Sequence, residues 1–491
     1  MPQVPEFETW VSRRYAGNRS LGAFVPFSSM SQDQCTPWVK AHVDRSVALW
    51  NECAGCVPGA PAEYSRAEQK RREKAYGDGV RAVEDELKTR PRPGIESAAQ
   101  RDRLMATFGR FATTAFGLQD DAVHMITHEF IPVGTELARW TRRFDPSMTK
   151  TDIVQACRNA WTACGLQPLL GRATELTPSI LAYSLMYPYT DNYLDRADIT
   201  GEAKRQFSAR FRERLRGNVS PPANEREAIL WTLVAMVERE YPRALFPQVH
   251  GSLLAIHAAQ ERSIAQLKNG GAATETGILE ISCEKGGTSV LADAFLARGT
   301  LTHAEARFAF DWGVLLQLGD DLQDLRDDLR RESATLFTRA VRRREPLDAL
   351  ARQLLAFSAR VAAGMDALPH TTPMLRTLLP MSWRSLIVEA VADARECFTR
   401  GFLAELERTS PFRLKFLRKS HKRLRRRRGL YESVFDTLVD TQDEQPARLP
   451  GCPRSGDPAN GSSFAGWRSP WLGPGMESHA ATNFSASELM Q

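Results

Sequence analysis

The feature that most constrains the fold is a succession of long segments with helical periodicity, divided by clusters of turn-forming residues. Two such clusters are residues 217–224 (GNVSPPAN) and 269–277 (NGGAATETG). Gly, Pro, Asn and Ser in such clusters end helices. The strict alternation of apolar and polar residues that indicates strands is hard to find anywhere in the chain. The sequence therefore predicts an all-α protein.

Composition divides the chain into three parts. At 491 residues it exceeds what one hydrophobic core usually supports. Residues 1–95 are predicted to form an N-terminal helical extension, in which the charged stretch Arg66–Lys88 reads as an exposed helix before the break RPRPG at residues 90–94. Residues 96–440 are predicted to form the main helical body. Residues 441–491 are rich in Pro, Gly, Ser and Ala, and they are predicted to be a disordered tail.

The longest apolar run is too short to cross a bilayer. It covers residues 228–237 (AILWTLVAMV) and is predicted to be a buried core helix. The N-terminus has early acidic residues and no apolar segment of a secretory signal. The eight cysteines are too scattered for a secreted disulfide scaffold. A cytoplasmic protein is expected.

Much of the net charge of +6 lies in one basic segment, from Arg418 to Arg428. Such a segment could contact RNA, anionic lipid or nothing. Because it lacks regular aromatic interleaving, a solvated helix surface is the first expectation and no nucleic-acid partner is expected. Peripheral contact with a membrane is the alternative.

Aspartates recur at four-residue intervals in two segments. The first carries Asp191 and Asp195, and the second carries Asp320, Asp324 and Asp328, with Asp321 beside them. On a helix, this spacing places carboxylates about 40° apart on one face, one turn above another. We therefore expect each segment to be a helix whose acidic row can hold a cation, with the second row on a single helix.

Acids at helical spacing usually form a solvated face, but the second row argues against that interpretation. Like charges four residues apart oppose helix formation by roughly 0.2 to 0.5 kcal/mol per pair, and Asp is a poor helix former. A short carboxylate suits Mg²⁺, which takes a few protein oxygens and leaves the rest to phosphates and water. An apolar stripe also lies about a third of a turn from the acids, formed by Leu318, Leu322, Leu325 and Leu329.

The uncharged residues below each row are expected to line a cavity. Gln317 and Gly313 lie one and two turns below Asp320, and Tyr187 lies one turn below Asp191. Both helices therefore read as carboxylates at a rim with less polar residues beneath them.

These motifs resemble those of the class I isoprenoid synthase superfamily, which includes trans-prenyltransferases, squalene and phytoene synthases, and terpene cyclases. Gly313-x-x-x-Gln317-x-x-Asp320-Asp321-x-x-Asp324 is similar to the second aspartate-rich motif of polyprenyl diphosphate synthases. Gln317 with Asp324-Leu-Arg-Asp-Asp328 also resembles the corresponding segment of squalene and phytoene synthases. Asp191-Asn-Tyr-Leu-Asp195 resembles the DxxxD first motif of that second branch.

The resemblance implies a helical bundle around a central cavity and a Mg²⁺-dependent reaction of an isoprenyl diphosphate. Lys285, in the segment CEKGGTS, matches the position of a diphosphate-binding lysine, and Arg196 and Arg331 are further candidates to bind the diphosphate. The resemblance also implies that Tyr187 limits the length of the bound chain. From the residues themselves, the Gly286–Gly287 pair is expected to interrupt a helix near the phosphate.

Several functions stay open at this stage. Within the enzyme interpretation they are chain elongation, head-to-head condensation, and cyclisation by a terpene synthase of the large tetraprenyl-curcumene type. The aspartates of the second motif favour a transferase. The alternative of another class is a non-catalytic helical scaffold whose acidic rows are solvated. A homodimer is a further expectation, and neither the substrate's chain length nor the product can be read from the sequence.

Overall fold

The computed structural model describes residues 35–56, 62–88, 95–196, 198–268 and 274–426, and all its elements are helices. The first half contains α2 (Cys35–Glu52), α3 (Arg66–Lys88), α4 (Ile95–Phe111), the π-helical turn η3 (Ala112–Phe116), α5 (Asp120–His124), the π-helical turn η4 (Met125–Phe130), α6 (Ile131–Phe144), α7 (Lys150–Leu169), α8 (Pro178–Asp195), α9 (Gly201–Leu215) and α10 (Glu225–Glu240).

The second half contains α11 (Pro247–Lys268), α12 (Glu275–Arg298), α13 (His303–Gln323), α14 (Leu325–Arg330), α15 (Leu336–Arg342), α16 (Asp348–Gly364), η5 (Met365–Ala367), α17 (Pro373–Asp393), η6 (Arg395–Cys397), α18 (Arg400–Arg408) and α19 (Leu414–Arg426). The prediction of an all-α protein is confirmed in the described part of the chain.

Nine helices of the described part of the chain begin at a polar capping residue. The side chains of the capping residues accept a hydrogen bond from the backbone N–H three residues later, which satisfies a donor that the helix itself leaves unpaired. The caps are Thr149, Thr177, Thr200, Asn224, Thr274, Thr302, Thr335, Thr372 and Thr399. Each such cap stabilises its helix by about 1 kcal/mol.

The predicted breaks agree with the structure where it describes them. Residues 217–224 separate α9 from α10, and the apolar run at 228–237 lies inside α10, with Leu230, Leu233, Val234 and Val237 buried. The breaks at 90–94 and 269–273 and the tail at 441–491 lie outside the described residues. No helix within the described ranges combines the length and the apolar character needed to cross a bilayer.

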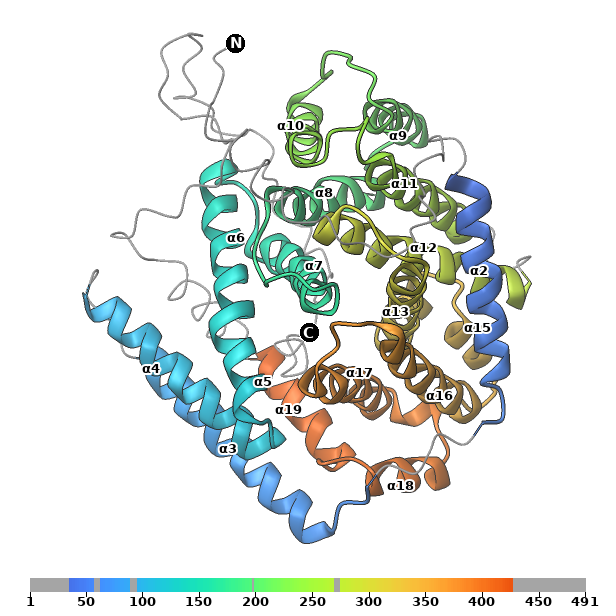
Figure 1. Cartoon of the computed structure of the whole chain (residues 1–491). Helices are drawn as coiled ribbons and strands as arrows, with labels where there is room; N and C mark the ends of the chain where they lie inside the picture. Colours follow the sequence, from blue (N-terminus) through green and yellow to red (C-terminus); the bar gives the residue numbers. More distant parts are fainter. Residues whose placement is uncertain (1–34, 57–61, 89–94, 197, 269–273, 427–491) are drawn as a thin grey trace.

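The central helix of the fold is α12, which contacts α2, α7, α8, α11 and α13 (Figure 1). Its closest neighbour is α13, and glycines allow the two backbones to touch. A Cβ atom on Gly286 would lie 2.4 Å from the Gly313 carbonyl oxygen, and one on Gly313 would lie 2.1 Å from the Gly286 carbonyl oxygen. The ring of Phe310 occupies the space that a side chain on Gly287 would need. Any larger side chain at these positions would push the helices apart.

This contact corrects two predictions. Gly286 and Gly287 do not interrupt a helix, because α12 runs unbroken through both. Gly313 is not part of a cavity wall, because it packs against Gly286. Glycines inside a helix were read as breaks, whereas here they serve close helix packing.

The N-terminal helices are part of the body. Arg45 and Ser46 of α2 donate hydrogen bonds to Asp311 of α13, at 2.8 and 2.7 Å. The helix predicted at Arg66–Lys88 is present, but the expectation that it is exposed is wrong, because it buries Glu73 and Glu84 together with Tyr76. The two glutamates are paired with cations of the C-terminal region, which a reading of local composition cannot reveal.

Candidate active site

One stripe of α12 is less buried than the rest of this helix. Between Ile281 and Ala297 every side chain of this helix is buried except three, Ile281, Lys285 and Ser289. These three follow one another at four-residue intervals and therefore form a single stripe along the helix. Other helices cover the remaining sides of α12, so this stripe is the part of the helix that water reaches.

The C-terminal part of α13 forms one side of this site. Leu316 is half-buried, and Asp320 and Asp324 are exposed, at four-residue intervals along one face. The predicted apolar stripe packs into the core, since Leu318, Leu322 and Leu325 are buried and Leu329 is half-buried. The expectation of one continuous acidic helix is wrong: α13 ends at Gln323, and α14 begins at Leu325.

The acidic row is held in an environment that opposes its charge. Burial by the surrounding protein raises the pKa of Asp320, although its side chain is accessible to water. Burial, together with the neighbouring carboxylates of Asp320 and Asp328, raises the pKa of Asp324 to about 7. The pKa of Asp328 is raised by burial as well. Accessible carboxyls that are nevertheless surrounded by protein are typical of a recessed site that binds cations.

Asp321 has a different environment from its neighbours. It is buried, and its two carboxylate oxygens accept hydrogen bonds from Gln317 at 2.8 Å and from Ser282 of α12 at 3.1 Å. Burial raises its pKa to about 7, and these hydrogen bonds oppose the rise. The predicted ligand Asp321 and the predicted substrate contact Gln317 therefore bind each other and fix α13 against α12.

Two cations act on the carboxylates from the other helices. Lys285 lies in the middle of α12 and is half-buried, and its charge lowers the pKa values of Asp320, Asp321 and Asp328. Arg158 of α7 lowers the pKa values of Asp320 and Asp324. Lys285 is thus brought to the acidic row as the sequence predicted.

Arg158 was missed by the reading of the sequence. It belongs to no recognisable motif, but it is the one cation between Lys150 and Arg172, in a helix of mainly small and apolar residues. A single arginine in such a helix is expensive unless it has an anionic partner, and that was the available signal.

Arg331 and Arg196, the two arginines predicted to bind the diphosphate, lie in different places. Arg331 is exposed, and its charge lowers the pKa of Asp328, so it lies at the edge of the acidic row. Arg196 forms an ion pair with Asp198 and lines a separate surface pocket of about 240 Å³ with Arg226 and Tyr189. It follows the last residue of α8 and has an extended backbone, so the helical spacing does not apply to it. The structure does not bring Arg196 to the carboxylates.

The first acidic segment lies at the same end of the bundle. Helices α8 and α12 are antiparallel: Ser179 contacts the carbonyl of Leu296, and the Tyr183 hydroxyl donates to the carbonyl of Ser289 at 3.3 Å. One turn beyond Tyr183, half-buried Tyr187 reaches the level of Lys285, and Asp191 reaches the level of Ile281 one turn further.

Asp191 is also contacted by α11, since it accepts a hydrogen bond from Gln260 at 2.7 Å. Asp195 is the last residue of α8, and its side chain lies outside the described part of the structure. We predict that the carboxylates of Asp191 and Asp320 face each other, close enough to bind the metal ions of one diphosphate.

The described side chains can hold a metal ion only if the substrate supplies some of the ligands of that ion. Among them, no three Asp, Glu, His or Cys groups converge closely enough to hold a metal ion by themselves. Mg²⁺ bound to one or two carboxylates and to phosphate oxygens needs no such cluster. The raised pKa values of the exposed Asp320 and Asp324 carboxyls fit this arrangement, because their charge is left partly uncompensated by the protein.

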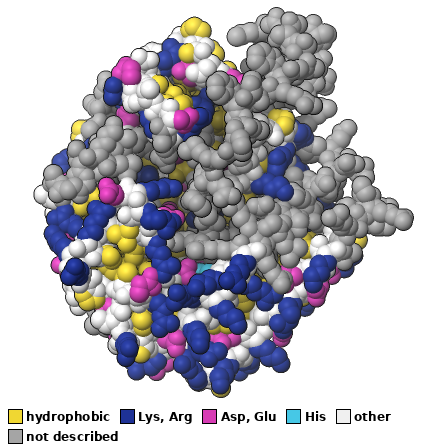
Figure 2. Space-filling view, turned by 180° about the vertical axis from the view of Figure 1, so that it is seen from behind, with side chains coloured by type: hydrophobic (Ala, Val, Ile, Leu, Met, Phe, Trp, Pro, Cys, Tyr) yellow, Lys and Arg dark blue, Asp and Glu magenta, His cyan; other side chains and the backbone are white. Residues whose placement is uncertain are grey.

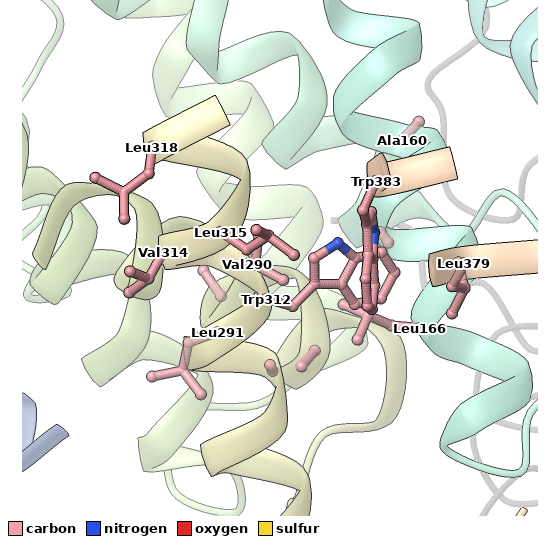
Figure 3. Close-up of a cluster of buried hydrophobic side chains, with 14 of the residues drawn as sticks. Ala160, Leu166, Val290, Leu291, Trp312, Val314, Leu315, Leu318, Leu379 and Trp383 are labelled. Carbon is pink, nitrogen blue, oxygen red and sulfur yellow. The ribbon is translucent and has the colours of Figure 1, made fainter. Parts of the chain in front are cut away.

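The helix that carries the acidic row also contributes to a buried apolar and aromatic cluster, which includes Trp312 of α13 and Trp383 of α17 (Figure 3). Trp312 lies eight residues before Asp320 on α13, which is about 12 Å along the helix. Its ring packs against Trp383 of α17 with 5.4 Å between centroids and contacts Gly165 of α7, where a Cβ atom would approach it to 3.3 Å. The Trp312 indole N–H is buried without a hydrogen-bond partner among the described residues. A hydrocarbon group entering from the acidic end would meet this aromatic layer.

Neutralising Asp324 should stabilise the fold. A native carboxyl with a pKa of about 7 holds a proton that the unfolded chain releases near pH 4, so stability falls as pH rises between these values. Asp324→Asn removes this loss. At pH 8 we expect its Tm to exceed that of the wild type by roughly 1 to 2 °C, because solvent screens part of the repulsion, and the difference should vanish near pH 4.

Thermal unfolding monitored by circular dichroism between pH 4 and 8 measures this difference. Asp44→Asn is the control, because Asp44 is exposed, pairs with Lys40 and is not among the charges that raise the pKa of Asp324, so its loss should not stabilise the protein. Equal or lower Tm of Asp324→Asn at pH 8 would show that the Asp324 carboxylate is compensated.

Comparison with protein-family models, with curated proteins and with solved structures finds no match for this chain.

Proposed function

We propose that the protein is a Mg²⁺-dependent isoprenoid synthase that ionises an isoprenyl diphosphate for prenyl transfer or condensation. The observation that supports the proposal is the pair Asp320 and Asp324, exposed to water yet raised in pKa, with two cations nearby: Lys285 of α12 lowers the pKa of Asp320, and Arg158 of α7 lowers the pKa of both. A site with carboxylates and cations side by side suits a diphosphate that carries its own metal ions. In this proposal the bundle belongs to the isoprenoid synthase type, and the acidic row would lie at the mouth of its central cavity.

Each group has a defined task in ionisation. The carbon–oxygen bond to the diphosphate breaks, and both electrons leave with the diphosphate. Lys285 and Arg158 would stabilise the charge that develops on its oxygens. Bound Mg²⁺ supplies Lewis-acid stabilisation of the same leaving group. Asp320, Asp324 and Asp328 on one side, and Asp191 and Asp195 on the other, would hold the metal, while Asp321 fixes the position of the row through Gln317 and Ser282.

The layer beneath the row suits the second requirement of the reaction. An allylic cation must be kept from water until it reacts, and aromatic rings stabilise a cation through their faces. Trp312, Trp383 and the half-buried Leu316 and Tyr187 supply aromatic and apolar surface below the carboxylates. The substrate's hydrocarbon chain would extend toward these residues.

A non-catalytic scaffold is the alternative of another class. Solvated acidic rows would keep ordinary pKa values and would need no opposing arginine in an apolar helix. The electrostatic conflict in the acidic row therefore favours an enzyme. Cyclisation by a terpene synthase uses the same ionisation step, and only the product distinguishes it from transfer.

The decisive experiment is incubation of the full chain with Mg²⁺ and a panel of prenyl diphosphates of different length, alone and in pairs. Released diphosphate measures ionisation, and mass spectrometry of the products distinguishes elongation, condensation and cyclisation. We expect release that stops when EDTA removes the metal. No release from any substrate or pair would favour the scaffold.

Tyr187 is expected to limit the length of the bound chain. It lies one turn, about 6 Å, below Asp191 on the same face of α8 and is half-buried. Tyr187→Ala should shift the preference toward longer substrates or products, measured as the ratio of kcat/KM for long and short substrates. Tyr189→Ala is the control, because Tyr189 faces the opposite side of the helix and bonds Asp145. An unchanged ratio in Tyr187→Ala would place the floor of the cavity elsewhere.

A further inference from the structure

The C-terminal basic helix α19 is docked on the body through one face. Leu414 and Leu417 are buried, and His421 lies buried between two carboxylates of α17, at 3.1 Å from Glu389 and 3.0 Å from Asp393. Two further ion pairs join this region to α3, Arg413 with Glu73 and Arg423 with Glu84. The apolar face of α19 is therefore used within the protein and is not available for insertion into a bilayer.

The other face of α19 carries a row of cations. Lys415, Lys419, Lys422 and Arg426 are exposed, and Arg418 is half-buried. Their spacing of three and four residues places them along one side of the helix, over about 16 Å. None of the five forms an ion pair within the described part of the chain. Lys and Arg side chains also dominate the lower half of the face in Figure 2, the height at which α19 lies in Figure 1.

We propose that this face of α19 binds the surface of an anionic membrane. The fit is one of charge complementarity: a firmly held, straight row of cations without an exposed apolar side chain matches a flat, negatively charged surface. RNA fits less well, because single strands are bound by aromatic side chains that stack on bases, and the one aromatic residue of α19, Phe416, is half-buried against the core. Contact is electrostatic and peripheral, and it does not depend on the proposed enzymatic activity.

The test is co-sedimentation of the full chain with vesicles of phosphatidylcholine, with and without about one third phosphatidylserine. We expect binding only to the anionic vesicles, weakening as salt rises from 0.05 to about 0.5 M because the Debye length shortens. The triple variant Lys415→Gln, Lys419→Gln and Lys422→Gln should bind on the order of 100-fold more weakly, since each cation near the surface contributes about fivefold.

A matched triple variant removes the same charge elsewhere. Lys204→Gln, Arg307→Gln and Arg342→Gln lie on α9, α13 and α15, and this variant should bind like the wild type. Circular dichroism and Tm show whether both variants keep the fold. Equal weakening of the two triples would mean that only net charge matters and would overturn the proposal. So would absence of binding to anionic vesicles, or tighter binding of a short RNA that depends on the same three lysines.

Discussion

Replacing Asp320 or Asp324 by Ala should lower the Mg²⁺-dependent release of diphosphate by about 100- to 1,000-fold while the helical fold stays intact. Loss of one pre-positioned group that stabilises transition-state charge typically has this effect. Both side chains are exposed, so their removal leaves no cavity in the core. The same loss is expected for Asp191 and Asp195, the first acidic segment.

Asp327→Ala is the control for this prediction. Asp327 is a neighbour on α14, but it forms an ion pair with Arg330 and should not contribute to catalysis. Steady-state kcat/KM with the best substrate of the panel and far-UV circular dichroism separate loss of chemistry from loss of fold. Wild-type turnover in Asp320→Ala or Asp324→Ala would contradict the assignment of that residue to the metal-diphosphate site.

The charges of Arg158 and Lys285 act on the same acidic row, so the release of diphosphate can test their roles as well. If Arg158 acts only through its positive charge, Arg158→Lys should retain its function. If its guanidinium binds two phosphate oxygens, an ammonium group cannot replace it. Comparing Arg158→Lys with Arg158→Ala in kcat and KM therefore reports how Arg158 contacts the substrate.

The second large effect is expected at His421. Burial alone would lower its pKa, but the hydrogen bonds to Asp393 and Glu389 outweigh burial and raise the pKa to about 10. His421→Ala would leave the two carboxylates without their shared cation, and removal of one partner from a buried ion pair costs about 3 to 5 kcal/mol in the free energy of unfolding. This loss should appear in urea unfolding at pH 7.

The stabilisation that His421 provides should decrease as the pH rises. A histidine whose pKa is raised above its unfolded value of about 6.5 stabilises the native state fully below that pH, and the stabilisation is lost as pH rises through about 10. The difference between wild type and His421→Ala should therefore be largest near pH 6 and shrink by pH 9.5. His303→Ala, at an exposed position, serves as the control. A difference independent of pH would show that His421 is neutral in the native protein.

What the sequence could predict was largely local. Helical periodicity and the turn clusters indicated the helices, and the charged helix Arg66–Lys88 was predicted with the bounds that the structure shows. The acidic row was predicted from its four-residue spacing, and Lys285 from the resemblance of its segment to that of prenyltransferases. The structure brings Lys285 to the row, while the metal and substrate stay predictions.

What the sequence could not predict depends on contacts between distant segments. Glu73 and Glu84 look like surface charges until Arg413 and Arg423 are known to cover them. Gly286 looks like a helix breaker until Gly313 is known to lie against it. Arg158 has no motif, and its role appears only when α7 is placed opposite α13.

The ion pairs that join α3 to the C-terminal region have a consequence for how the protein is made. Glu73 and Arg413 are separated by 340 positions in the chain. At roughly 5 to 20 residues per second, a ribosome needs on the order of 20 to 70 seconds to synthesise the second partner after the first. During that interval α4 and η3 can already cover much of α3, but Glu73 and Glu84 lack their native cationic partners. The nascent chain therefore cannot close before α19 has emerged from the ribosome, and a message truncated before that helix would yield a product that chaperones and proteases recognise as unfinished.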